Sequence, residues 1–120
     1  MIVAAASFLK SLAKLRSVAW DSVASEIGKH ARGVENFVDL GVVAGRRVLK
    51  GYLNAGRVRL VVLLQESRGT YVPCFVAKKE SADGFNVTRR DLEGFLGDAV
   101  DRVAADVAAG RYELREIART

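Results

Sequence analysis

The stretch GRRVLKGYLNAGRVRLVVLLQESRGTYVPCFVAK, residues 45–78, decides the fold because it contains three β-rich runs joined by short turn sequences. The runs are 45–53, 56–65 and 70–78, and the joining sequences NAG and ESRG place a glycine where a hairpin needs a positive φ. We therefore predict three consecutive antiparallel strands, a β-meander. Pro73 has no amide hydrogen to donate to a neighbouring strand, so it predicts either an edge position or a β-bulge.

The sequence before these strands has a different pattern. Residues 2–6, IVAAA, form a short apolar run that predicts a first strand, and Ser7 offers a helix N-cap. Apolar residues then recur at helical spacing, which predicts two helices at about 8–15 and 18–31, packed as a hairpin. Residues 33–45 show no clean period and are interpreted as a loop with some buried anchors.

A long helix is predicted after the three strands. Thr88 and Asp91 have the spacing of a capping box, and apolar residues keep to one helix face over residues 92–107. Gly110 is expected to end this helix. Residues 111–117 alternate between polar and apolar, which predicts a short terminal strand or an extended tail.

Together these elements predict a single α+β domain over residues 1–120, with the helices on one face of an antiparallel sheet. Half of the residues are hydrophobic and 28% are charged, which is typical of a folded domain. No apolar run approaches the roughly 18 residues of a membrane span, so no membrane is expected among the partners. The one cysteine, Cys74, cannot form an internal disulfide, which fits a reducing, cytoplasmic setting.

The net charge of +5 is unevenly distributed. Residues 1–33, 34–60 and 61–90 carry +3, +3 and +2, whereas residues 91–120 carry −3. A basic middle favours a polyanionic partner, either RNA or an acidic protein. The alternative interpretation is a domain with an uneven surface charge and no such partner.

Basic residues gather on the predicted strands. By the two-residue period of a strand, Arg46 and Lys50 share one face of the first strand with Tyr52. Arg57 and Arg59 lie on the second strand, and Lys78 and Lys79 end the third. A meander is expected to bring these groups together on the face or rim that the helices leave uncovered. Like charges repel there unless solvent or a polyanion screens them. The set therefore indicates either a cradle for a phosphate backbone or a solvated sheet face.

The residue types that most enzyme classes use for catalysis or metal binding are scarce in this sequence. His30 is the only histidine and lies at a predicted helix end, where a cation is stabilising, and Cys74 lies among apolar neighbours. We expect no metal and no cofactor. RNA can be cleaved by its own 2′-hydroxyl, so a protein needs only to orient the bond, stabilise charge and move protons. Tyr52 and Tyr71 are the tyrosines near the basic set that could transfer a proton.

Four segments follow one another in a recognisable order: SFLKSLAKL (7–15), RRVLKGYL (46–53), GRVRLVVLLQ (56–65) and FVAKKESADGFNVTRRDLEGF (75–95). In this order and spacing they resemble the RelE/ParE toxin superfamily, and most closely its HigB/RelE-like branch. VAAGRYELREI (107–117) is similar to the C-terminal helix and tail of that family. The resemblance covers nearly the whole chain and implies a RelE-like fold.

The resemblance implies the toxin of a type II toxin–antitoxin pair. Most such toxins are endoribonucleases that cut mRNA, commonly on the ribosome, without a metal. The implied partners are a cognate antitoxin, mRNA and the ribosome, and the antitoxin complex can be a heterotetramer. The expected catalytic residues are Lys78, Arg59 and Lys50, with Tyr71 added for proton transfer. The expected RNA-binding residues are Arg46, Arg47, Arg57 and Lys79.

Two alternatives stay open. One is a ParE-like protein that inhibits DNA gyrase by binding and performs no catalysis, and the other is a basic RNA-binding module. The catalytic histidine and C-terminal tyrosine of the family have no secure counterpart, because Tyr112 lies in the tail. Residues 34–90 carry ten basic and five acidic groups, so an antitoxin is expected to cover them with an acidic amphipathic segment.

Overall fold

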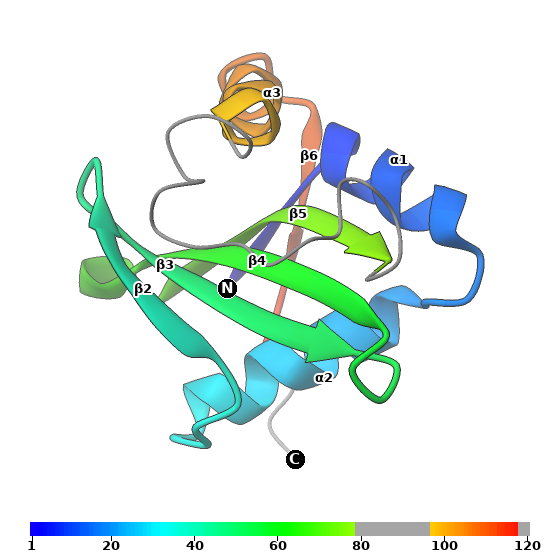
Figure 1. Cartoon of the computed structure of the whole chain (residues 1–120). Helices are drawn as coiled ribbons and strands as arrows, with labels where there is room; N and C mark the ends of the chain where they lie inside the picture. The colour runs from blue at the N-terminus through cyan, green and yellow to red at the C-terminus, as the bar shows by residue number, and fades with distance from the viewer. Residues whose placement is uncertain (79–96, 118–120) are drawn as a thin grey trace.

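The computed structural model describes residues 1–78 and 97–117, which form an α+β domain (Figure 1). The α+β class predicted from the sequence is therefore confirmed. In chain order the elements are β1 (Ile2–Ala5), α1 (Ala6–Leu15), α2 (Trp20–Ala31), β2 (Val38–Val43), β3 (Arg46–Leu53), β4 (Val58–Gln65), the 3₁₀ turn η1 (Glu66–Arg68), β5 (Thr70–Lys78), α3 (Gly97–Ala108) and β6 (Tyr112–Arg115).

The sheet has six strands in the order β2-β3-β4-β5-β1-β6. The three strands predicted from residues 45–78 are confirmed, and they pair antiparallel in sequence as β3, β4 and β5. The predicted first strand and terminal strand also form, with β1 parallel to β5 and β6 antiparallel to β1. The sheet is therefore mixed and larger than the three-stranded antiparallel sheet that we expected.

The interpretation of residues 33–45 as a loop is wrong, because β2 forms there and pairs antiparallel with β3. Val43 pairs with Arg46, so only Ala44 and Gly45 connect the two strands. Both connecting residues have positive φ, 52° and 77°, as a tight hairpin turn of matching twist requires. Alanine rarely adopts that conformation, so the sequence carried a weak signal for this turn.

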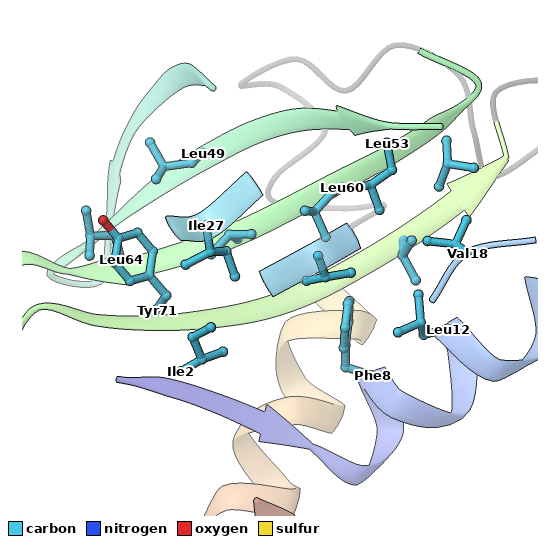
Figure 2. Packing of buried hydrophobic residues seen from close by; sticks show 14 residues of the cluster. Ile2, Phe8, Leu12, Val18, Ile27, Leu49, Leu53, Leu60, Leu64 and Tyr71 are labelled. Atoms are coloured by element: carbon cyan, nitrogen blue, oxygen red, sulfur yellow. The ribbon is translucent and has the colours of Figure 1, made fainter. Parts of the chain in front are cut away.

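Helices cover both faces of the sheet, so the prediction that they lie on one face is wrong. In Figure 1, α2 lies on one side of the sheet and α3 on the other. The larger core cluster packs α1 and α2 against side chains such as Leu49, Leu60 and Tyr71 (Figure 2). A second cluster places Val103 of α3 against Val61 on the opposite face. Strand β4 lies inside the sheet and carries apolar side chains on both of its faces, and such a strand is buried on both sides.

The two N-terminal helices form where they are predicted, but they do not pack mainly against each other. Helix α1 contacts chiefly β5 and α3, whereas α2 contacts β3, so the expected helical hairpin is wrong. Each helix instead finds its own part of the sheet. Within residues 1–78 and 97–117, no helix combines the length and the hydrophobicity that crossing a bilayer requires.

A backbone amide in the first turn of helix α1 donates a hydrogen bond to a carboxylate of helix α3. Ser7 lies inside α1 and is not its N-cap, because the cap residue is Ala5, which makes no side-chain hydrogen bond. The Ser7 amide donates to the Asp106 carboxylate of α3 at 2.7 Å, and the Arg111 Nε donates to the same carboxylate at 3.0 Å. Asp106 is therefore buried at the contact between α1 and α3.

The predicted C-terminal helix is confirmed over Gly97–Ala108, and Gly110 follows it with a positive φ of 74°. The proposed capping box at Thr88 and Asp91 lies outside the described residues.

Pro73 is accommodated by a β-bulge, one of the two options that the sequence left open. Val61 of β4 pairs with Phe75, and the next residue, Val62, pairs with Pro73, so Cys74 is the extra residue of β5. An extra residue reverses the alternation of side chains along the rest of a strand. The bulge therefore changes which face each residue after Cys74 occupies, and this determines where Lys78 points.

Candidate nucleic-acid interface

Five of the residues singled out in the sequence lie toward one end of the sheet. There β3 ends, β4 begins and β5 ends, because Leu53 and Lys78 both pair with Val58. We call this group the basic rim; its members are Lys50, Tyr52, Arg57, Arg59 and Lys78. Lys79 belongs to the expected RNA-binding set but lies outside the described residues.

Lys50 and Tyr52 form the centre of the basic rim. They are two residues apart on β3, and the Lys50 Nζ lies 5.9 Å from the centroid of the Tyr52 ring. This cation–π contact holds the ammonium group above the aromatic face. Tyr52 is 37% exposed, so part of the residue remains accessible to a ligand.

Arg57 and Arg59 lie at the start of β4 in different environments. Arg57 is exposed in the turn before the strand, where its amide donates to the Asn54 carbonyl at 3.2 Å. Arg59 pairs with Tyr52 on the face that α3 covers in part, and only 4% of the residue is exposed. We expected Arg59 on an open face, but in this conformation RNA cannot reach it directly.

Lys78 is exposed at the end of β5 but does not share a face with Arg59. It pairs with Val58, whereas Arg59 pairs with Ala77, and neighbouring residues of a strand point to opposite faces. Lys78 and Arg59 therefore lie on opposite faces of the sheet. They belong to the same rim, and Lys78 reaches a ligand only around the end of the sheet.

The remaining expected site residues lie at the other end of the sheet. Arg47 pairs with Leu64, and Leu64 with Tyr71, so both lie nearer the opposite end of the strands than Lys50 does. Arg46 begins β3 at the same end, where it is exposed. The sequence therefore predicted one cluster where the structure has two.

Arg47 is held by two carboxylates. Its Nη1 donates to the Asp39 Oδ2 at 2.6 Å, and its Nε donates to the Glu66 Oε1. The hydrogen bonds to Glu66 and Asp39 raise the pKa of the Arg47 guanidinium. A hydrogen bond from the Gly41 amide, together with Arg47, lowers the pKa of Asp39. The sequence did not reveal these partners, because the pairing of β2 with β3 was missed.

Tyr71 lies in the core on the face covered by α1 and α2. It is 5% exposed, and burial raises the pKa of its hydroxyl. A hydrogen bond of 2.9 Å joins this hydroxyl to the His30 Nδ1 at the end of α2. His30 thus anchors α2 to β5, in addition to the helix-end role expected for it. Tyr71 lies on the opposite face of the sheet from Lys50, which leaves Tyr52 as the tyrosine of the basic rim.

Cys74 is a core residue, as expected. Burial raises the pKa of its thiol to about 12, so the thiol stays protonated and a poor nucleophile near neutral pH. Among residues 1–78 and 97–117, no three His, Cys, Asp or Glu side chains lie close enough together to hold a metal ion.

Comparisons of the chain with protein-family models, with curated proteins and with solved structures each found no match.

Proposed function

We propose that this chain is the toxin of a type II toxin–antitoxin pair and acts as a metal-independent endoribonuclease that cuts mRNA. Its fold would then be a variant of the RelE-like arrangement. The sequence resemblance supports this function, and the observation that carries it is the Lys50–Tyr52 pair at an exposed sheet end. A cation beside a partly exposed aromatic ring is typical of surfaces that bind single-stranded RNA.

The basic rim can supply both binding and chemistry. Arg57 and Lys78 hold the phosphate backbone on either side of the sheet end, and the Tyr52 ring offers a surface on which a base can stack. Lys50 stabilises the charge that develops when the 2′-hydroxyl attacks the adjacent phosphate. The Tyr52 hydroxyl takes the proton-transfer role, which Tyr71 cannot fill from inside the core.

A cognate antitoxin would neutralise the protein by covering the same surface. An acidic amphipathic segment is expected to lie across the basic rim and to bind more weakly as salt rises. Without that antitoxin, expression of the protein is expected to arrest growth at translation.

The direct test is to incubate the purified protein with translating ribosomes and to map new RNA 5′ ends. Lys50→Ala is expected to remove most cleavage. Tyr52→Phe should keep RNA binding, because the ring can still stack, but lose cleavage, because the hydroxyl is gone. Lys10→Ala, which removes one charge from an exposed position of α1, is the matched control and should cleave normally.

The alternatives give different results in the same preparation. RNA binding without new 5′ ends would indicate a non-catalytic RNA-binding module. Inhibition of gyrase in a supercoiling assay, with intact mRNA, would indicate a ParE-like inhibitor. Cleavage that is equal in the wild type, Lys50→Ala and Tyr52→Phe would show that the basic rim is not the active site.

A further inference from the structure

A second feature of the molecule is a cavity of about 500 Å³ between α3 and the sheet, on the face opposite α2. Its wall is largely apolar, and the main contributors are Leu63, Val72, Val100, Val103, Val107 and Leu114. Volumes of this size, with apolar walls and a few polar groups, are typical of sites that bind small molecules. The basic rim lies at the other end of the strands, so this cavity is separate from the proposed RNA site.

The cavity is open to solvent along an apolar margin. Met1, Val107 and Leu114 line it and are 46%, 39% and 58% exposed. Large apolar side chains this exposed are individually ordinary, but a group of them around one cavity marks a binding surface. Whatever binds here therefore gains most of its stabilisation from an apolar body.

The polar groups of the cavity are gathered at one end. Gln65 and Thr70 pair with each other across β4 and β5, next to the turn that carries Arg68. Arg46 begins β3 beside Arg47, whose partner is Leu64, so it reaches the same end. All four side chains line the cavity.

The charge at this end is positive. Two of the four polar side chains are guanidinium groups, and no acidic residue is among the described residues that line the cavity. The nearby carboxylates of Asp39 and Glu66 are engaged by Arg47. Guanidinium groups bind carboxylates through charge-assisted, often paired hydrogen bonds.

We propose that this cavity binds the anion of a single-chain fatty acid. The acyl chain lies between α3 and the sheet, along Leu63, Val72 and Val107, and the carboxylate is bound by Arg46 and Arg68. Gln65 and Thr70 supply further hydrogen-bonding groups to the same carboxylate. The inference does not depend on the proposed nuclease function, because it rests on different residues at the opposite end of the sheet.

Size favours an acyl chain over an acidic amphipathic helix from a partner protein. A helix with its side chains is about 10–12 Å across and rises about 5.4 Å per turn. One turn of a helix with its side chains therefore occupies roughly 500 Å³. A single turn is not a stable helix on its own, so most of a bound helix would lie outside the cavity, whereas a flexible acyl chain can lie within it.

The test is calorimetric titration of the full-length protein with sodium dodecanoate below its micelle-forming concentration, with circular dichroism to check that the fold is kept. Saturable binding is expected. Hexanoate has the same head group and a short chain, and dodecyltrimethylammonium has the same chain and a cationic head. Both are expected to bind at least about tenfold more weakly than dodecanoate. Hexanoate buries less apolar surface, and dodecyltrimethylammonium has no carboxylate for the arginines to bind.

Two adjacent alanines provide a matched pair of variants. Ala104 and Ala105 are both exposed on α3, but only Ala104 lines the cavity. Ala104→Phe should fill the acyl site and weaken dodecanoate binding by about tenfold or more, whereas Ala105→Phe should change it by less than about twofold. For the head group, the double variant Arg46→Ala/Arg68→Ala should lose about tenfold or more, and Arg102→Ala on α3 should not.

Any of the following results would overturn the proposal. The first is an absence of saturable dodecanoate binding. The second is equal binding of dodecanoate by the Ala104→Phe and Ala105→Phe variants, or equal binding of dodecyltrimethylammonium and dodecanoate by the wild type. The last concerns an acidic helical peptide titrated in the same way. If Ala104→Phe weakens binding of that peptide but not of dodecanoate, the cavity is a protein-docking surface.

Discussion

The salt dependence of RNA binding gives a quantitative test of the basic rim. Lys50, Arg57 and Lys78 are the rim cations whose side chains are exposed or half-buried, whereas Arg59 is buried. Each phosphate that a cation neutralises on a single strand contributes a slope of about −0.7 to the plot of log K against log salt. Three contacts predict a slope of about −2.1, so affinity should fall about 18-fold between roughly 50 and 200 mM salt.

Removing one contact should change the slope by a known amount. Lys50→Ala, Arg57→Ala and Lys78→Ala should each bring the slope to about −1.4, which reduces the loss over the same salt range to about sevenfold. The measurement is fluorescence anisotropy of a labelled single-stranded RNA titrated at several salt concentrations. Slopes are more informative than single affinities here, because a folding defect lowers affinity at every salt concentration alike.

The controls separate a local site from a general effect of net charge. Lys10→Ala removes the same charge from α1 and should leave the slope unchanged. Arg47→Ala removes a cation already held by Asp39 and Glu66, and it should also leave the slope unchanged. A slope near zero in the wild type, or an equal change in Lys10→Ala and Lys50→Ala, would refute the assignment of the rim as the RNA-binding surface.

Three further predictions concern the fold. At pH 8 the Cys74 thiol, with its pKa near 12 instead of 9.0, should react with a disulfide reagent about 1,000-fold more slowly in the native than in the urea-unfolded protein, and fast native labelling would contradict its burial. Hydrogen bonds from Ser7, and then Arg111, lower the pKa of Asp106, so Asp106→Asn should lower stability. The wild-type advantage, measured by urea unfolding, should be full above about pH 4 and shrink as acid protonates the folded carboxyl; a deficit that persists unchanged at pH 2 would exclude this origin. A Cβ on Gly51 would lie 2.5 Å from the Phe37 ring, so Gly51→Ala should cost about 1–3 kcal/mol in the free energy of unfolding, whereas Gly97→Ala, with nothing within 4 Å, should cost none.

Local periodicity was enough to find most elements of the fold. The apolar spacing in residues 8–15 and 18–31 and the glycine turns at residues 54–56 and 69 are properties of short segments, and the helices and strands formed there. Strand β2 was missed because its signal depends on its neighbour. Val38, Val42 and Val43 are all exposed, so no buried face alternates along it, and its turn uses an alanine in a conformation that favours glycine.

The arrangement of the candidate site was harder to predict for a definite physical reason. A two-residue period tells which residues share a face only while a strand remains regular, and the extra residue Cys74 breaks that regularity in β5. Without the bulge, Tyr71 and Lys78 would point to opposite faces, but with it both lie on the face of Val58 and Leu64. Tyr71 is in consequence buried beside His30, and Lys78 reaches the rim from the face opposite to Lys50. The basic residues of this sheet therefore act as one group only at the end of the strands, where a ligand can contact both faces. A single-stranded RNA, which can bend around that end, suits the geometry better than a rigid duplex.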